Sequence, residues 1–174
     1  MAAEKLAPIG TGFLYVRQAK IEKLWPLMAA ADKQKTDIRK FEEIGTHPAA
    51  NHNAISEALT FHQGIGSERK IARLRYLRDR WMKRLEGQPG VKLYTSYNPA
   101  MSGALSNIGL EGKEPAKITA YLWDKHRILV TPIGHTACTG IRVTPNVYTT
   151  LGEIDTFGDA METIIKQGLP LTKA

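Results

Sequence analysis

An apolar run near the start of the sequence constrains the fold most. Residues 13–16, Phe-Leu-Tyr-Val, have the length and the β-prone side chains of a buried strand. Gly10 and Gly12, just before the run, allow the backbone to pass close to another group. A buried strand needs neighbours in its sheet, and we expect none upstream. We therefore interpret this run as one strand of a larger domain of which most is missing from the chain.

Length and composition predict one folded core. The 174 residues, 43% of them hydrophobic, suffice for a single domain or for a domain with a piece of another. No run approaches the roughly 18 apolar residues of a membrane span, and Met1 to Lys5 does not begin a signal peptide. The single cysteine, Cys138, excludes an intramolecular disulfide. The default expectation is a cytoplasmic protein without a membrane partner.

The order of the expected helices and strands predicts an α/β fold. Apolar spacing, prolines and glycines indicate helices near 48–64, 67–87, 115–126 and 150–167, and strands near 91–97, 103–109, 127–131 and 140–144. Thr150 and Glu153 form a capping-box pattern at the start of the last helix. Two or three helices over a small mixed or antiparallel sheet make an α/β sandwich.

The positive charge is concentrated in one segment. Between Ser67 and Gly87 there are eight basic and three acidic residues, which is +5 of the chain's net +7. Apolar residues at helical spacing predict an amphipathic helix with a core face and a basic, solvated face. Because neither interleaved aromatic residues nor a nucleic-acid motif accompanies it, we do not expect nucleic acid as a partner.

Metal binding and cysteine chemistry find little support. The five histidines lack the spacing of a helical zinc site, and there is no second cysteine to help. His135 and Cys138 form a possible base and nucleophile, yet no third group is available to orient them. We expect no metal site, and we interpret Cys138 as a structural thiol.

Two other positions suit anions. Gly45 and Thr46 precede His47-Pro48 at a helix start, where a hydroxyl and free backbone N–H groups favour a phosphate. Arg142 lies in an otherwise apolar strand, and its planar guanidinium suits a carboxylate. Taken alone, each position is more often structural.

Three blocks of the sequence follow one another in a specific order: Gly10–Arg17, Phe41–Thr46 before an alanine-rich helix, and Ile141–Thr150 before Glu153-Ile154-Asp155. Together they resemble the class V aminotransferase family, and in particular its isopenicillin N epimerase-like members. The resemblance implies a pyridoxal-phosphate enzyme of the aspartate-aminotransferase fold, with the cofactor between two domains of a homodimer. Only the C-terminal part of such an enzyme is expected: a large-domain remnant and connector at 1–40, and the small domain at 41–174.

The resemblance also implies roles for single residues. Gly45 and Thr46 match the position that binds the cofactor phosphate of the neighbouring subunit, and Arg142 matches the arginine that holds the carboxylate of an amino-acid substrate. The position of the Schiff-base lysine is occupied by Ala3, and Lys5 lacks that lysine's flanking residues. We therefore expect no catalytic residue, no tight binding of pyridoxal phosphate and no turnover by the chain alone.

The substrate, an amino acid or an amine, and the reaction stay open among transamination, epimerisation, elimination and decarboxylation. Cys138 is too close to Arg142 to match the persulfide cysteine of the related cysteine desulfurases. The alternative to an enzyme segment is a non-enzymatic interaction module that binds an acidic partner through the basic helix 67–87. A standalone enzyme that uses Cys138 or Lys5 is a third hypothesis, which no residue pattern favours. Because the opening run exposes apolar area, we expect the isolated chain to aggregate or dimerise.

Overall fold

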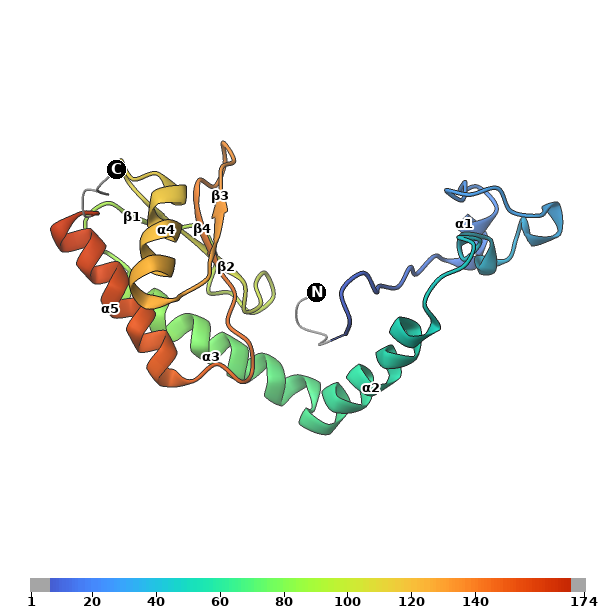
Figure 1. The fold of residues 1–174 in the computed structure, drawn as a ribbon, viewed down its shortest axis with the longest axis horizontal. Helices are drawn as coiled ribbons and strands as arrows, with labels where there is room; N and C mark the ends of the chain where they lie inside the picture. Colours follow the sequence, from blue (N-terminus) through green and yellow to red (C-terminus); the bar gives the residue numbers. More distant parts are fainter. Residues whose placement is uncertain (1–6, 170–174) are drawn as a thin grey trace. The chain divides into compact units, whose positions relative to one another are not determined.

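The computed structural model describes residues 7–169. Contacts within the chain divide it into two compact units, which meet in the sequence between Ile65 and Gly66 (Figure 1). The expected boundary at residue 40 concerns the complete enzyme and stays a prediction. Lys5 and Ala3 lie outside the described residues. None of the described helices has the length and apolar character needed to cross a membrane.

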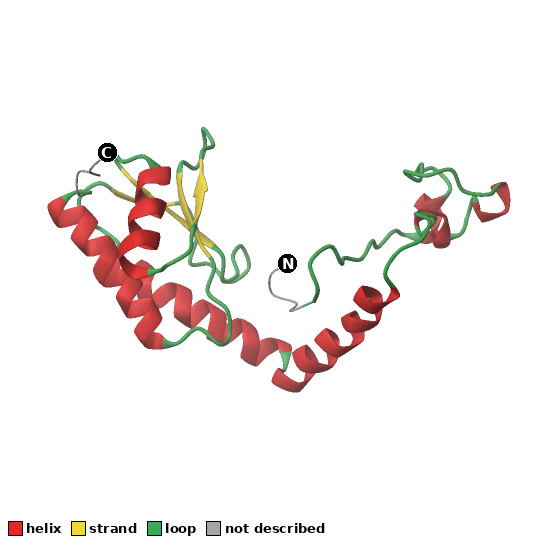
Figure 2. Cartoon of the chain, in the orientation of Figure 1, coloured by secondary structure: helices red, strands yellow, loops and turns green. Residues whose placement is uncertain are grey.

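The N-terminal unit consists of short helices and loops. It contains α1 (Gln18–Ile21), η2 (Asp32–Gln34), η3 (Ile38–Phe41) and α2 (Ala49–Ile65). Figure 2 shows that the part of this unit that the structure describes is helix and loop, without a strand.

The strand expected at 13–16 is therefore wrong for the chain as it stands. Residues 11–17 form no regular secondary structure, and Phe13 and Tyr15 are 76% and 79% exposed. A strand requires backbone partners in a sheet, and the described residues supply none for this run. Its apolar side chains remain in solvent.

The connector after α1 is tied together by a buried lysine. Lys40 is 4% exposed, and its ammonium donates hydrogen bonds to the carbonyls of Ile21 and Lys35. Asp37 caps η3 by accepting a hydrogen bond from the backbone N–H of Arg39. The buried charge of Lys40 is tolerated because carbonyl oxygens accept hydrogen bonds from its ammonium group.

The C-terminal unit contains a four-stranded antiparallel sheet. Its strands are β1 (Val91–Leu93), β2 (Ser106–Leu110), β3 (Thr131–Ile133) and β4 (Gly140–Val143), and their order is β1-β2-β4-β3. Strand β3 begins at Thr131, so the strand expected at 127–131 is wrong in its position. Arg127 adopts a left-handed conformation (φ 55°) that closes the preceding helix, and residues 128–130 are irregular.

Three helices complete this unit: α3 (Ser67–Leu85), α4 (Pro115–His126) and α5 (Leu151–Gln167). Helix α3 packs on α5, while α4 contacts β3, β4 and α5. Trp81 and Phe157 meet edge to face at 5.3 Å between ring centroids. The fully buried core comes from the helices and one face of the sheet, and includes Leu77, Trp81, Met82, Leu85, Ile108, Leu122, Ile141, Met161 and Ile164. The predicted α/β class is confirmed.

Helix α5 begins with the predicted capping box. The Thr150 hydroxyl accepts from the N–H of Glu153, and the Glu153 carboxylate accepts from the N–H of Thr150. The N–H and the hydroxyl of Thr150 both donate to the Glu153 carboxylate, and these two hydrogen bonds lower the pKa of Glu153. Helix α3 starts differently, because Ser67 is already its first residue and Gly66 before it offers no side-chain cap.

Candidate functional site

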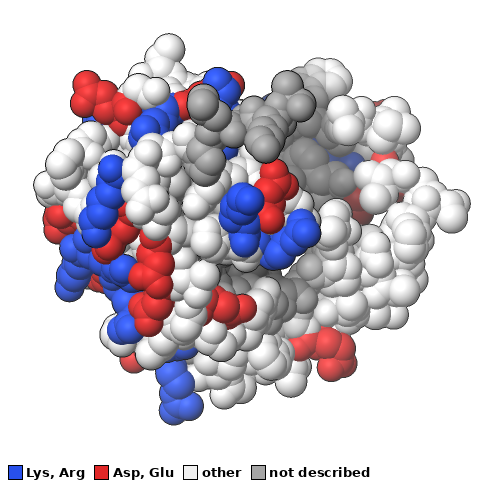
Figure 3. Space-filling model, turned by 60° about the vertical axis from the view of Figure 1, so that its left-hand side comes forward, with Lys and Arg blue, Asp and Glu red and all other residues white. Residues whose placement is uncertain are grey.

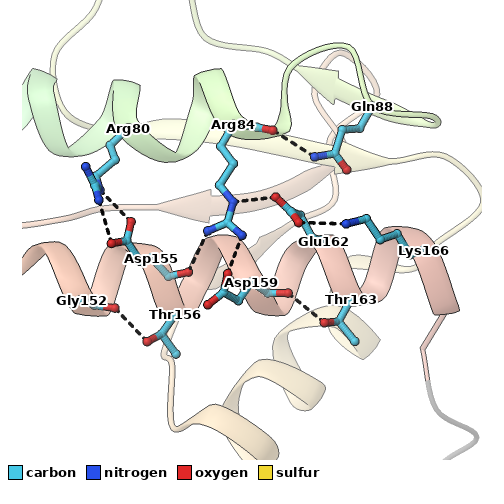
Figure 4. Close-up of polar contacts among 10 residues, drawn as sticks. All are labelled: Arg80, Arg84, Gln88, Gly152, Asp155, Thr156, Asp159, Glu162, Thr163 and Lys166. Atoms are coloured by element: carbon cyan, nitrogen blue, oxygen red, sulfur yellow. Dashed lines mark hydrogen bonds and ion pairs between the residues drawn. The ribbon is translucent and has the colours of Figure 1, made fainter.

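The basic face of α3 is neutralised by acidic residues of α5. Arg80 donates two hydrogen bonds to Asp155, at 2.7 and 2.8 Å, and Arg84 pairs with Asp159 and Glu162 (Figure 4). Arg84 lowers the pKa of Glu162 to about 2. The expected solvated basic face is therefore wrong for these two arginines, because carboxylates of α5 pair with them. These partners lie some 75 residues further along the sequence, so no local pattern indicates them.

Three further arginines of α3 also have partners within the unit. Arg73 donates to the carbonyl of Thr149, and Arg75 donates to the carbonyls of Pro99 and Ser102. Arg78, 1% exposed, pairs with Asp79 and donates to the loop at residues 102–103. On the face drawn in Figure 3, basic and acidic side chains are interspersed. The helix thus uses most of its charge to hold its own unit together.

Arg142 lies in a different environment. It projects from β4 on the face of the sheet opposite the core, since its neighbours Ile141 and Val143 are buried in that core. Its Nη2 donates to the hydroxyl of Thr131 at 3.3 Å, and its Nε is buried without a hydrogen-bond partner. No acidic side chain among residues 7–169 forms an ion pair with Arg142. The guanidinium of Arg142 therefore has N–H donors available for an anion.

The sheet register places Arg142 between two polar residues. Asn107 of β2 and Thr131 of β3 are its direct partners on the neighbouring strands. Gly140, two residues earlier on β4, lies on the same face and carries no side chain. A Cβ there would stand 2.3 Å from the carbonyl oxygen of Ile108. The strands approach closely beside the arginine because this residue is a glycine.

Gly45 and Thr46 belong to the N-terminal unit and are described within it. Gly45 has a positive φ of 75°, and its carbonyl oxygen lies 2.9 Å from Nδ1 of His47. Thr46 is exposed, and its hydroxyl makes no hydrogen bond to the described residues. It lies three residues before the first residue of α2, close to the unpaired N–H groups of a helix start. This loop is an open position for an anion.

His135 and Cys138 lie in the turn between β3 and β4. The N–H of Cys138 donates to the carbonyl of His135, and Nδ1 of His135 accepts from the N–H of Ala137. The ring thus stabilises the turn. Over the described part of the chain, no group of three His, Cys, Asp or Glu side chains is arranged for a metal ion.

The residues that flank Arg142 cannot be predicted from the sequence. Asn107 and Thr131 are ordinary polar residues of two other strands, and only the register brings them beside the arginine. The alternation of β2, with Ile108 buried, shows that Asn107 faces away from the core. No local pattern reveals which residue of β4 lies opposite.

The sequence and the fold of this chain match a known family. The sequence model described as Aminotransferase class-V matches residues 2–157, and the chain belongs to this family. Isopenicillin N epimerase from Streptomyces clavuligerus is 29% identical over 91% of the chain, and that from Amycolatopsis lactamdurans is 28% identical over 92%. The chain spans 44% of the length of either relative.

Solved structures agree on the fold. The cystine C–S lyase C-DES superposes with a TM-score of 0.69 at 18% identity, over 89% of this chain and 42% of its own. The apo cysteine desulfurase from Thermococcus onnurineus NA1 gives 0.64 at 23% identity, over 73% of this chain and 34% of its own. One structure of C-DES carries glycine covalently linked to its pyridoxal-phosphate cofactor. The predicted fold is confirmed, and so is pyridoxal 5'-phosphate as the cofactor of the family.

The described residues fit the periphery of such a cofactor. The free hydroxyl of Thr46 beside a helix start suits a phosphate, and the open fork of Arg142 suits the carboxylate of a substrate. Each of these two groups therefore has the chemistry to bind an anion.

Proposed function

We propose that this chain is the C-terminal segment of a pyridoxal-phosphate-dependent class V enzyme that acts on an amino acid or amine. In this proposal Arg142 binds the substrate carboxylate, and Gly45 with Thr46 binds the cofactor phosphate of a neighbouring subunit. The proposal includes a homodimer, or a complex with a separate large-domain segment. The coverage of 44% of the epimerase length supports the assignment to a segment.

The observation that supports the proposal most strongly is that the guanidinium of Arg142 has unpaired N–H donors. The arginines of α3 at positions 73, 75, 78, 80 and 84 all bind carboxylates or carbonyls of their own unit. Arg142 has only a 3.3 Å contact with Thr131 and a buried Nε without a partner. A guanidinium with unpaired N–H donors can bind a planar anion through two parallel hydrogen bonds.

The chemistry divides between the cofactor and the chain. When bound, the cofactor supplies an electron sink for bonds at the substrate Cα. Arg142 contributes by fixing the carboxylate end of the substrate, so that the reacting atoms keep one orientation. The Thr46 hydroxyl donates a hydrogen bond to a phosphate oxygen. The segment thus orients the substrate and leaves bond cleavage to groups outside it.

The first test concerns the gene. The coding sequence upstream of Met1, or in an adjacent frame, should encode a large domain with a lysine-bearing stretch. A genomic context without such a sequence would refute the assignment to a segment.

The second test concerns Arg142 in the assembled enzyme. Arg142→Ala should raise KM about 10- to 100-fold for an amino acid, because a hydrogen-bonded charge contributes about 1.5–3 kcal/mol. The KM for the corresponding decarboxylated amine should not change. Arg142→Lys keeps the charge but not the planar guanidinium, so its KM for the amino acid should lie between those of the wild-type enzyme and Arg142→Ala. Arg69→Ala, an exposed residue of α3, is the matched control. Equal losses for amino acid and amine would contradict the role.

The arginine pairs of α3 leave the interaction-module hypothesis without a supporting observation. Arg80 and Arg84 are occupied by Asp155, Asp159 and Glu162, so an acidic partner would have to displace these residues. We therefore propose only the enzyme segment.

A further inference from the structure

Asn107 is the residue that lies opposite Arg142 across the β2–β4 pair. The two Cα atoms are register partners, and both side chains project from the sheet face away from the core. In such pairs the Cβ atoms are about 4.5–5.5 Å apart, so the side chains are within reach of each other. Asn107 is thus the nearest polar neighbour of the arginine on this strand.

The two side chains carry complementary unpaired atoms. Nε of Arg142 is a buried donor without a partner, and Oδ1 of Asn107 is a buried acceptor without a partner. Buried polar atoms in native structures are nearly always hydrogen-bonded, so each such exception calls for an explanation. Here one donor and one acceptor occur on two residues that face each other.

The carboxamide of Asn107 is already oriented. Its Nδ2 donates to the carbonyl of Cys138 at 2.9 Å, which ties the amide group to the turn before β4. Its Oδ1 lies on the β4 side, 2.6 Å from the point where a Cβ of Gly140 would stand. Glycine at 140 leaves room for this oxygen on the strand that carries Arg142.

We infer that Asn107 is a positioning residue for Arg142. Its Oδ1 accepts a hydrogen bond from Nε when the guanidinium binds a carboxylate, and this contact turns the two Nη groups toward the substrate. The carboxylate is then held end-on by both Nη groups, while Nε is occupied. This inference rests on the proposed role of Arg142. It adds that the site selects planar carboxylates that approach along the axis of the side chain.

The experiment uses the full chain and acetate as the probe. The ¹H–¹⁵N resonance of Arg142 Nε is identified by its loss in Arg142→Lys and followed during titration with acetate, against chloride at equal ionic strength. In the wild-type chain the Nε–H resonance should move downfield and saturate. In Asn107→Ala the acetate dissociation constant should rise about tenfold, and the downfield shift should be absent.

A second variant and a control separate positioning from stability of the turn. Asn107→Asp places a permanent acceptor beside Nε, so the resonance should lie downfield before acetate is added and acetate should bind more weakly. Thr139→Ala removes the hydrogen bond from the Thr139 hydroxyl to the carbonyl of His135 in the same turn. It should behave as wild type.

The outcomes distinguish the two proposals. No saturable response in the wild-type chain would overturn the role of Arg142 itself. A wild-type response that Asn107→Ala leaves unchanged would overturn the inference alone. The inference also fails if Thr139→Ala reproduces the effect of Asn107→Ala, or if Asn107→Asp leaves the Nε resonance unmoved in the absence of acetate.

Discussion

Two leucines that lie seven residues apart allow a direct test of the core. Leu122 of α4 is fully buried, with 0% exposure, whereas Leu129 in the following loop is 83% exposed. Both can be changed to alanine, so the chemistry of the substitution is the same and only burial differs. The comparison also tests the finding that Leu129 lies in solvent.

The magnitude follows from the burial. Leu122→Ala removes three buried carbon groups at about 0.8 kcal/mol each and leaves a cavity, so the free energy of unfolding should fall by about 3–4 kcal/mol. A unit of this size has about 5–15 kcal/mol of stability, so the variant should still fold. Leu129→Ala should change the free energy by less than about 0.5 kcal/mol.

Urea denaturation followed by tryptophan fluorescence measures both variants. Trp81 is fully buried and reports on this core, while Trp25 and Trp123 are largely exposed. With a slope of about 1.5 kcal/mol per molar urea, Leu122→Ala should lower the midpoint by about 2 M. The measurement is made at low protein concentration, because self-association would cover exposed leucines. Equal midpoint shifts for both variants would refute the described packing.

Two further predictions concern the glycine beside Arg142 and the charges of α5. Gly140→Ala should destabilise the unit by about 1–3 kcal/mol, because the new Cβ meets backbone atoms of Ile108. Gly152→Ala is the control, since the space around Gly152 is open. Equal urea midpoints for the two variants would contradict the close approach of β2 and β4 at Gly140. The pKa of Glu162 is lowered to about 2, first by Arg84 and to a smaller extent by Lys166, so the stabilising effect of its charge is present above about pH 4.5 and is lost as pH falls toward 2. Arg84→Gln should flatten this part of the stability–pH curve, and a curve as steep as that of the wild-type chain would exclude the pair as its cause.

Local signals predicted the helices well. Pro115 and His126 bound α4 as expected, because proline suits the first turn of a helix and Arg127 adopts the left-handed conformation that ends it. Thr150 and Glu153 fixed the start of α5 for a similar local reason.

Local sequence patterns do not predict features that depend on residues far apart in the sequence. The run at 13–16 has strand propensity but no sheet partner among the described residues, and β-propensity depends on such partners. The basic face of α3 reads as a solvated one in the sequence, because its acidic partners belong to α5. The chemistry of Arg142 and the block around it point to this residue, whereas only the strand register places Asn107 beside it.

We propose that the chain carries substrate-binding residues of a class V enzyme, whereas the reactive lysine belongs to a segment outside it. The decisive experiment mixes the purified chain with pyridoxal 5'-phosphate, records the visible-edge absorbance, and then treats the sample with borohydride before mass spectrometry. We expect no absorbance band of a lysine-bound cofactor and no trapped adduct. A stoichiometric phosphopyridoxyl adduct on Lys5, or on any single lysine of the chain, would contradict it.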